Sequence, residues 1–199
     1  MKGPGSYCKF CAHHLVWSVP ANDSVPRHHC PECGHVEYET PIPTVSTLLI
    51  ARGKILFVRR AIPPYTGKWA PPGGYPEKGE SMREAAVREL REETGLVIPQ
   101  SSLIPFFLSS ISPINQYYIA FRSHVSDLLD PICGPEVSAA AWFGRQDFPA
   151  EEYWLPALTS ILSDVYDCID SDHYPLHVAD VTEQLFESNS FEIGGTGSS

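Results

Sequence analysis

The sequence predicts an α/β domain that is preceded by a small zinc-binding module. Three observations carry this prediction: two CxxC pairs in the first forty residues, several β-rich segments from Thr44 onward, and two amphipathic helical patterns. A chain of 199 residues is long enough for one ordinary domain and an appendage. We divide it into a zinc ribbon at 1–40, a main domain at 41–170 and a C-terminal extension at 171–199, whose low-complexity end we expect to be mobile.

The composition excludes several classes of protein. The net charge is −10 and the pI is near 5.2, which argues against broad binding of nucleic acid phosphates. No run of about 18 apolar residues occurs, so we expect no membrane span. The N-terminal sequence MKGPGSYCKF lacks the apolar core of a signal peptide, and we therefore expect a cytoplasmic protein.

The first forty residues contain four cysteines with the spacing of a zinc site. The two CxxC pairs, separated by 18 residues, are Cys8, Cys11, Cys30 and Cys33. Each pair can present two thiolates to one Zn²⁺, which would stabilise a segment too short to have its own core. Two disulfides and redox chemistry are alternatives, but no secretion signal or βαβ pattern supports either. The neighbouring histidines are interpreted as bystanders.

The main domain begins with a predicted β-hairpin. Its strands are Thr44–Ala51 and Lys54–Arg60, and Arg52-Gly53 forms the turn between them. The following segment AIPPYTGKWAPPGG is rich in proline and glycine, and we expect it to be irregular.

A well-delimited helix with an unusual charge pattern follows this loop. Ser81 and Glu84 form a predicted capping box, and Gly95 suits the left-handed position after the helix. Glu89, Glu92 and Glu93 fall within an arc of about 100° on a helix with 100° per residue. Such like charges repel, so a divalent cation with oxygen ligands would compensate them. A solvated, charged surface helix is the alternative.

The C-terminal half contains further strands and a second helix. Leu103–Ile111 and Asn115–Val125 are predicted to pair, and Val137–Phe143 is a further strand candidate. The segment Asp147–Ser171 begins as a loop and continues as an amphipathic helix that should pack on the sheet. The pattern weakens after Ser171.

The region from Gly74 to Leu96 resembles the signature of the Nudix hydrolases. The matching residues are Gly74, Glu80, Arg88, Glu89, Leu90, Glu92, Glu93, Gly95 and Leu96. The resemblance implies a Nudix αβα sandwich with a mixed β-sheet. It also implies Mg²⁺ or Mn²⁺ held by Glu89, Glu92, Glu93 and the Gly73 carbonyl, with structural Zn²⁺ in the ribbon.

The same resemblance implies roles for residues around the metal. Arg88 would orient a glutamate, and Glu89 or Glu136 would act as general base. Substrate-binding candidates are Arg59, Arg60, Trp69 and Tyr117, although exposure or packing are alternative roles for each of them.

The resemblance implies cleavage of a pyrophosphate bond in a nucleoside diphosphate that is linked to another moiety, releasing AMP and X-phosphate. The zinc-ribbon branch includes plant FAD and ADP-ribose pyrophosphatases, which this sequence resembles more than it resembles the NADH pyrophosphatases. We expect FAD or ADP-ribose ahead of NADH. The partner would be a small nucleotide, with no membrane or nucleic acid, and a homodimer is left open. The alternative is a non-catalytic Nudix and zinc-ribbon module that binds nucleotide or RNA.

Overall fold

The computed structural model describes residues 7–182 and 186–192, and the chain divides into two compact units between Thr40 and Pro41. The first unit contains a three-stranded antiparallel sheet in the order β1-β2-β3. Its strands are β1 (Val16–Ser18), β2 (Arg27–His29) and β3 (Val36–Glu37). No described helix is long and apolar enough to cross a membrane.

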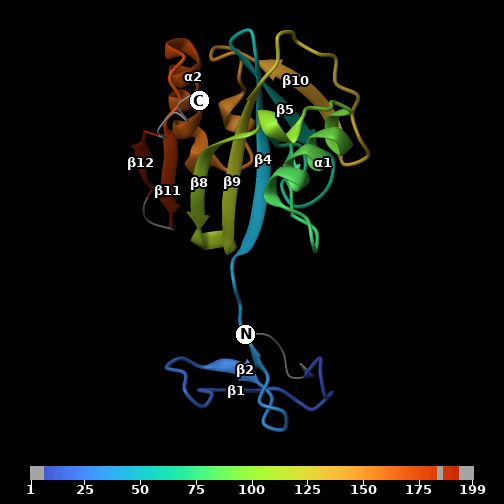
Figure 1. The fold of residues 1–199 in the computed structure, drawn as a ribbon, viewed down its shortest axis with the longest axis vertical. Coiled ribbons are helices and arrows are strands. Elements are labelled where there is room, and N and C mark those ends of the chain that lie inside the picture. Colours follow the sequence, from blue (N-terminus) through green and yellow to red (C-terminus); the bar gives the residue numbers. More distant parts are fainter. Residues whose placement is uncertain (1–6, 183–185, 193–199) are drawn as a thin grey trace, which may run out of the picture. The chain divides into compact units, whose positions relative to one another are not determined.

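The second unit is built on one mixed sheet, as the resemblance implies (Figure 1). The strand order is β10-β5-β4-β9-β8-β11-β12. These strands are β4 (Ile42–Ala51), β5 (Lys54–Arg60), β8 (Ile104–Ile111), β9 (Gln116–His124), β10 (Val137–Phe143), β11 (Leu176–Val181) and β12 (Phe186–Phe191). The pairs β4–β9 and β8–β11 are parallel, and the other neighbours in this order are antiparallel.

The helices α1 (Met82–Thr94) and α2 (Thr159–Ser171) cover opposite faces of this sheet (Figure 1). Strand β4 shows why, because successive side chains of a strand point to opposite faces. Leu48 and Ile50 pack in the core that contains α2, whereas Val45 and Leu49 pack in the core that contains α1. The expected αβα sandwich is confirmed.

The local signals around α1 are confirmed in detail. The Ser81 Oγ accepts the amide of Glu84, and the Glu84 carboxylate accepts the amide of Ser81, which forms the capping box. Gly95 has φ 70° and ends the helix in the left-handed conformation. The Arg52-Gly53 turn joins β4 and β5, with φ 47° and 75°.

Two segments differ from the expectation. The proline- and glycine-rich loop contains two short strands, β6 (Trp69–Ala70) and β7 (Gly73–Gly74), which pair with β5 and β4. The sheet also continues past residue 170, because β11 pairs with β8 and β12 pairs with β11. Such long-range pairing leaves only a short local pattern in the sequence. The low-complexity end that we expected to be mobile is 191–199: Phe191 belongs to β12 and pairs with Leu176, and residues 193–199 lie outside the described residues.

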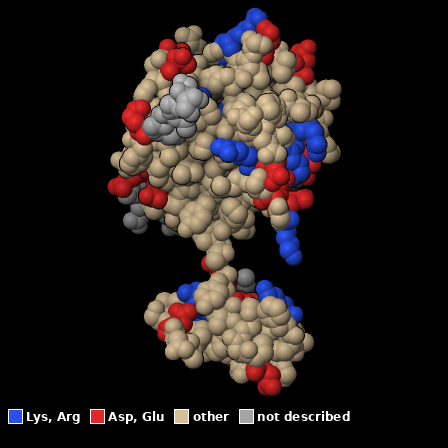
Figure 2. All heavy atoms as spheres, in the orientation of Figure 1, with Lys and Arg blue, Asp and Glu red and all other residues tan. Residues whose placement is uncertain are grey.

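Short 3-10 turns complete the second unit at the ends of its loops. They are η1 (Gln100–Ser102), η2 (Ser112–Ile114), η3 (Ala150–Glu152) and η4 (Pro156–Leu158). Figure 2 shows acidic and basic side chains interspersed on the face in view, rather than a continuous basic surface among the described residues there.

Candidate active site

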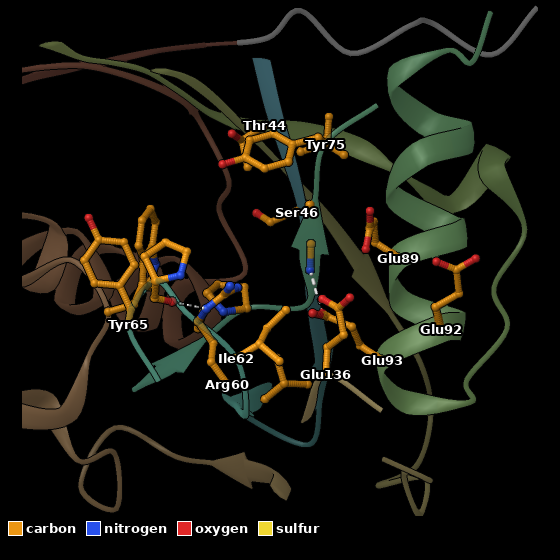
Figure 3. A pocket seen from close by; sticks show the side chains of 18 of the residues that line it. Thr44, Ser46, Arg60, Ile62, Tyr65, Tyr75, Glu89, Glu92, Glu93 and Glu136 are labelled. Atoms are coloured by element: carbon orange, nitrogen blue, oxygen red, sulfur yellow. Dashed lines mark hydrogen bonds between the residues drawn. The ribbon is translucent and has the colours of Figure 1, made fainter. Parts of the chain in front are cut away.

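A pocket of about 740 Å³ opens beside α1 in the second unit (Figure 3). Carboxylates from α1 and from the segment before β10 line one part of it, whereas aromatic and apolar side chains line another. Its lining includes Thr44, Ser46, Arg60, Tyr65, Gly73, Gly74, Tyr75, Arg88, Glu89, Glu92, Glu93, Gln116, Tyr118, Glu136 and Trp154. The three glutamates of the helical stripe therefore face one cavity.

Two glycines bring the β7 backbone against these glutamates. The Gly73 amide donates a hydrogen bond to Glu93 Oε2 at 2.9 Å. A Cβ at Gly74 would lie 2.4 Å from Glu89 Oε1, and a Cβ at Gly73 would lie 2.2 Å from the Val45 carbonyl oxygen. The contact at Gly73 is with backbone atoms of β4 and requires glycine, whereas the contact at Gly74 is with the end of the Glu89 side chain. Strand β7 and α1 together line one part of the site.

Arg88 connects the acidic residues to one another. Its Nε and Nη2 donate to the two oxygens of Glu80 at 2.9 and 3.0 Å, which is a bidentate ion pair. Its Nη1 donates to Glu89 at 2.8 Å and to Glu92 at 3.1 Å. Arg88 therefore orients Glu89 and Glu92, whereas Glu84 belongs to the capping box and does not pair with it. Arg88 also lowers the pKa of Glu80 by its hydrogen bonds.

The glutamates of the pocket are partly or largely buried and lie close to one another, so their negative charge is not fully compensated by Arg88. Burial raises the pKa of Glu93 to about 8, and the charges of Glu89 and Glu136 add to this effect despite the Gly73 amide. Burial also raises the pKa of Glu89, which the hydrogen bond from Arg88 only partly offsets. A carboxylate-only donor set with unbalanced negative charge fits a hard divalent cation. A bound cation would share Glu89 and Glu92 with Arg88.

Glu136 belongs to the same site although it lies far from α1 in the sequence. It precedes β10 and lines the pocket, and Figure 3 shows it beside Glu93. Its charge contributes to the raised pKa of both Glu89 and Glu93. The predicted candidates Glu89, Glu92, Glu93 and Glu136 therefore line one pocket with Arg88.

Three of the four substrate-binding candidates lie elsewhere. Trp69 is buried and packs edge-on against Phe143 with ring centroids 4.9 Å apart. Arg59 donates to the Gly67 carbonyl and to Glu152, each at 2.8 Å. Tyr117 is exposed and does not line the pocket. Because side chains alternate along a strand, Arg60 and Tyr118 face the pocket instead of their neighbours.

Several lining residues were missed at the level of sequence. Tyr118 follows the predicted candidate Tyr117 by one position. Because side chains alternate along a strand, Tyr118 lies on the same face of β9 as the pocket residue Gln116. Tyr75 directly follows the two glycines, and its hydroxyl accepts a hydrogen bond from Gln116 Nε2 at 2.9 Å. Trp154 comes from the loop before α2, and no local pattern marks it as a pocket residue. Figure 3 shows Tyr65 near Arg60.

The four cysteines of the first unit converge as predicted. Their sulfur atoms all lie within 4.8 Å of one another. Four thiols at this separation fit a tetrahedral zinc site.

The comparisons with known proteins agree with this geometry. Residues 40–163 match the NUDIX domain. The chain belongs to the Nudix family. Residues 6–39 match the Nudix zinc ribbon that is described as the Nudix N-terminal family. Both parts of the predicted resemblance are therefore confirmed.

Individual relatives cover the chain to different extents. A NUDIX hydrolase of Nitrosomonas europaea has TM-score 0.79 at 27% identity, over 89% of this chain and 99% of that one. An ADP-ribose pyrophosphatase of Methanocaldococcus jannaschii is 40% identical over 72 residues, which are 36% of this chain and 43% of the relative. The NAD-capped RNA hydrolase NudC of Pseudomonas aeruginosa is 27% identical over 166 residues, 80% of this chain and 54% of the relative. This Nudix chain spans about half or less of the length of the curated relatives it matches.

Proposed function

We propose that this Nudix protein hydrolyses the pyrophosphate bond of an ADP-containing nucleotide and releases AMP and X-phosphate. The observation that carries the proposal is a pocket in which Glu89, Glu92, Glu93 and Glu136 lie beside aromatic side chains. The acidic part suits a cation-bound diphosphate, and the aromatic part suits a flat ring. The names of the ADP-ribose pyrophosphatase and NAD-capped RNA hydrolase relatives support the same class of substrate.

Glu89, Glu92, Glu93 and the Gly73 carbonyl are the proposed ligands of Mg²⁺ or Mn²⁺. When bound there, such an ion would neutralise the diphosphate and favour deprotonation of water. The protein prepares the ligands through Arg88, which fixes Glu89 and Glu92, and through the Gly73 amide, which fixes Glu93. Zn²⁺ is proposed for the ribbon in a structural role.

Glu136 is the proposed general base. Glu89 accepts a hydrogen bond from Arg88 and is a proposed metal ligand, whereas no ion pair is found for Glu136 among the described residues. Glu136 would take the proton of the attacking water. The water oxygen then bonds to one phosphorus, and the bridging P–O bond breaks so that the second phosphate leaves with the electron pair.

The pocket favours a substrate with one flat ring and one hydroxyl-rich moiety. Tyr65 and Trp154 form the aromatic part, with ring centroids 5.5 Å apart and a T-shaped arrangement. Tyr75, Gln116 and Thr44 line another part, and the Thr44 Oγ1 is buried with no hydrogen-bond partner among the described residues. A sugar hydroxyl would satisfy such a group. We therefore place ADP-ribose first, FAD next and NADH after them.

A substrate panel tests this proposal. The purified chain with Mg²⁺ or Mn²⁺ is offered ADP-ribose, FAD, NADH, diadenosine polyphosphates, 8-oxo-dGTP and coenzyme A. We expect metal-dependent release of AMP, fastest from ADP-ribose. Binding without turnover of any compound would contradict the enzyme and favour a nucleotide- or RNA-binding module instead.

A further inference from the structure

The segment at 131–137 contains Glu136 and is hydrogen-bonded both to the end of α1 and to Ala61, which follows β5. It also acts as the C-terminal cap of α1. The last carbonyls of a helix have no partner within the helix. Here the Ile132 amide donates to the Thr94 carbonyl at 2.8 Å, and the Gly134 amide donates to the Glu93 carbonyl at 3.1 Å. The segment is therefore bonded to the helical turn that carries Glu92 and Glu93.

The contact at Gly134 leaves no space for a side chain. A Cβ there would lie 1.9 Å from the Glu92 carbonyl oxygen and 3.0 Å from the Glu92 carbonyl carbon. These are backbone atoms of α1, so they cannot rotate away as the end of a flexible side chain could. Any larger residue must move the segment away from α1 or distort the last turn of the helix.

The other end of the segment is fixed to β5. The Ala61 amide, next to the pocket residue Arg60, donates to the Glu136 carbonyl at 2.8 Å. The Val137 amide donates to the Gly134 carbonyl at 3.1 Å, and Val137 then pairs with Arg60. Only Pro135 separates Gly134 from Glu136, so a shift at Gly134 passes directly to Glu136.

We propose that Gly134 is a positioning residue that fixes the Glu136 carboxylate relative to Glu89 and Glu93 by locking the segment 131–137 onto the end of α1. Its role depends on backbone contact and on the absence of a side chain. The catalytic part of this inference rests on the proposed function, in which Glu136 is the general base, whereas the contact itself can be tested without turnover.

Gly134→Ala tests the inference, with Gly144→Ala as the matched control. A Cβ at Gly144 would meet its nearest atom at 3.6 Å, an ordinary contact, so the control changes the same chemistry without a clash. We expect Gly134→Ala to lower kcat by about a hundredfold with little change in KM, the size of effect that a misplacement of about 1 Å produces. Gly144→Ala should keep the kcat of the wild type.

A double variant shows whether Gly134 acts through Glu136. We expect Glu136→Gln to lower kcat, and addition of Gly134→Ala to that variant to lower it little further, because the group being positioned is already lost. Multiplicative losses would mean that Gly134 acts through the α1 glutamates and would overturn the assignment to Glu136. Full activity of Glu136→Gln, or of Gly134→Ala, would overturn it as well.

Hydrogen exchange provides a readout that does not depend on activity. The amides of Ile132 and Gly134 should be protected in the wild type and in Gly144→Ala, and should exchange faster in Gly134→Ala while the core strands keep their protection. If the wild type turns over no substrate of the panel, the proposed function fails. Hydrogen exchange alone then decides whether Gly134 holds the segment 131–137 against the end of α1. Equal exchange rates of these amides in all three proteins would refute the role of Gly134 in holding the segment 131–137 against α1.

Discussion

The two units of this chain contain aromatic residues in comparable abundance but bury them very differently. In the ribbon, Phe10 is 71% exposed and Trp17 is 62% exposed, whereas Cys8 and Cys30 are 2% and 0% exposed. In the second unit, Phe57 is 0% exposed and Phe121 is 3% exposed, one in each of the two cores that flank the sheet. The ribbon is thus organised around sulfur atoms, and the Nudix domain is organised around apolar side chains.

This difference indicates where the free energy of folding comes from in each unit. Zinc binding to structural sites contributes on the order of 10–16 kcal/mol, which can fold a segment that buries almost no apolar surface. The Nudix domain depends on burial, and its core helix α1 also carries the acidic cluster. One helix therefore provides packing on one side and proposed metal ligands on another.

Substitution of one ribbon cysteine should have the largest effect on folding, and this effect should be confined to the first unit. We expect Cys30→Ser to abolish zinc binding and unfold the ribbon, because the free energy of zinc binding is the folding free energy of such a unit. The Nudix domain should keep its melting temperature, since the chain forms two separate compact units. Metal content and the melting curve measure the two effects.

Cys133→Ser is the control for this variant, because Cys133 is an exposed cysteine of the other unit. It should retain one zinc ion per chain. A Cys30→Ser protein with full zinc content and a folded ribbon would contradict the metal-centred account of the first unit.

A core substitution in α1 should have a smaller effect, confined to the second unit. Leu90 is 0% exposed. Leu90→Ala should lower the free energy of unfolding by about 2–5 kcal/mol through lost burial and a cavity, without changing zinc content. Val97→Ala, at a position that is 70% exposed, is the control and should change it little. Chemical denaturation measures the free energy of unfolding of both variants. Equal losses in the two would contradict the view that burial of Leu90 stabilises the second unit.

The pH dependence of stability should reveal the acidic cluster. Between the unfolded value of 4.5 and the folded pKa of about 8, Glu93 holds more protons in the folded chain than in the unfolded chain. Without Mg²⁺, its contribution should therefore make the free energy of unfolding fall as pH rises through this window. Added Mg²⁺ should reverse this trend, because a bound cation favours the ionised carboxylate.

The comparison with Glu93→Gln isolates this contribution, because ribbon and histidine titrations are common to both proteins. Denaturation at several pH values should show that the difference in stability between the two proteins depends on pH only across that window. A pH-independent difference would show that Glu93 ionises normally in the folded chain.

The sequence predicted most of the acidic wall but little of the opposite wall. Glu89, Glu92 and Glu93 lie on one helix, so their spacing alone determines that they share a face. Tyr118 and Trp154 reach the pocket from a strand and a loop that meet only through the fold. Tyr118 lines the pocket and the predicted Tyr117 does not, because the sequence does not reveal which face of β9 meets the pocket.

The C-terminal strands show the same limit of local patterns. β11 pairs in parallel with β8, which lies about seventy residues earlier in the chain. Only His177, Ala179 and Val181 alternate as buried positions, with Asp180 exposed between the last two. Such a short mixed pattern resembles many loops, so the sheet could be traced only as far as the strands with strong alternation.

The most direct test of the central claim is the rate of AMP release from ADP-ribose by Glu93→Gln. The substitution keeps nearly the same shape but removes the charge at the most buried member of the cluster. We predict that kcat with saturating Mg²⁺ falls by about a hundredfold or more, the scale of losing one charge-stabilising group, while the fold stays intact. A folded Glu93→Gln protein with the activity of the wild type would contradict the account.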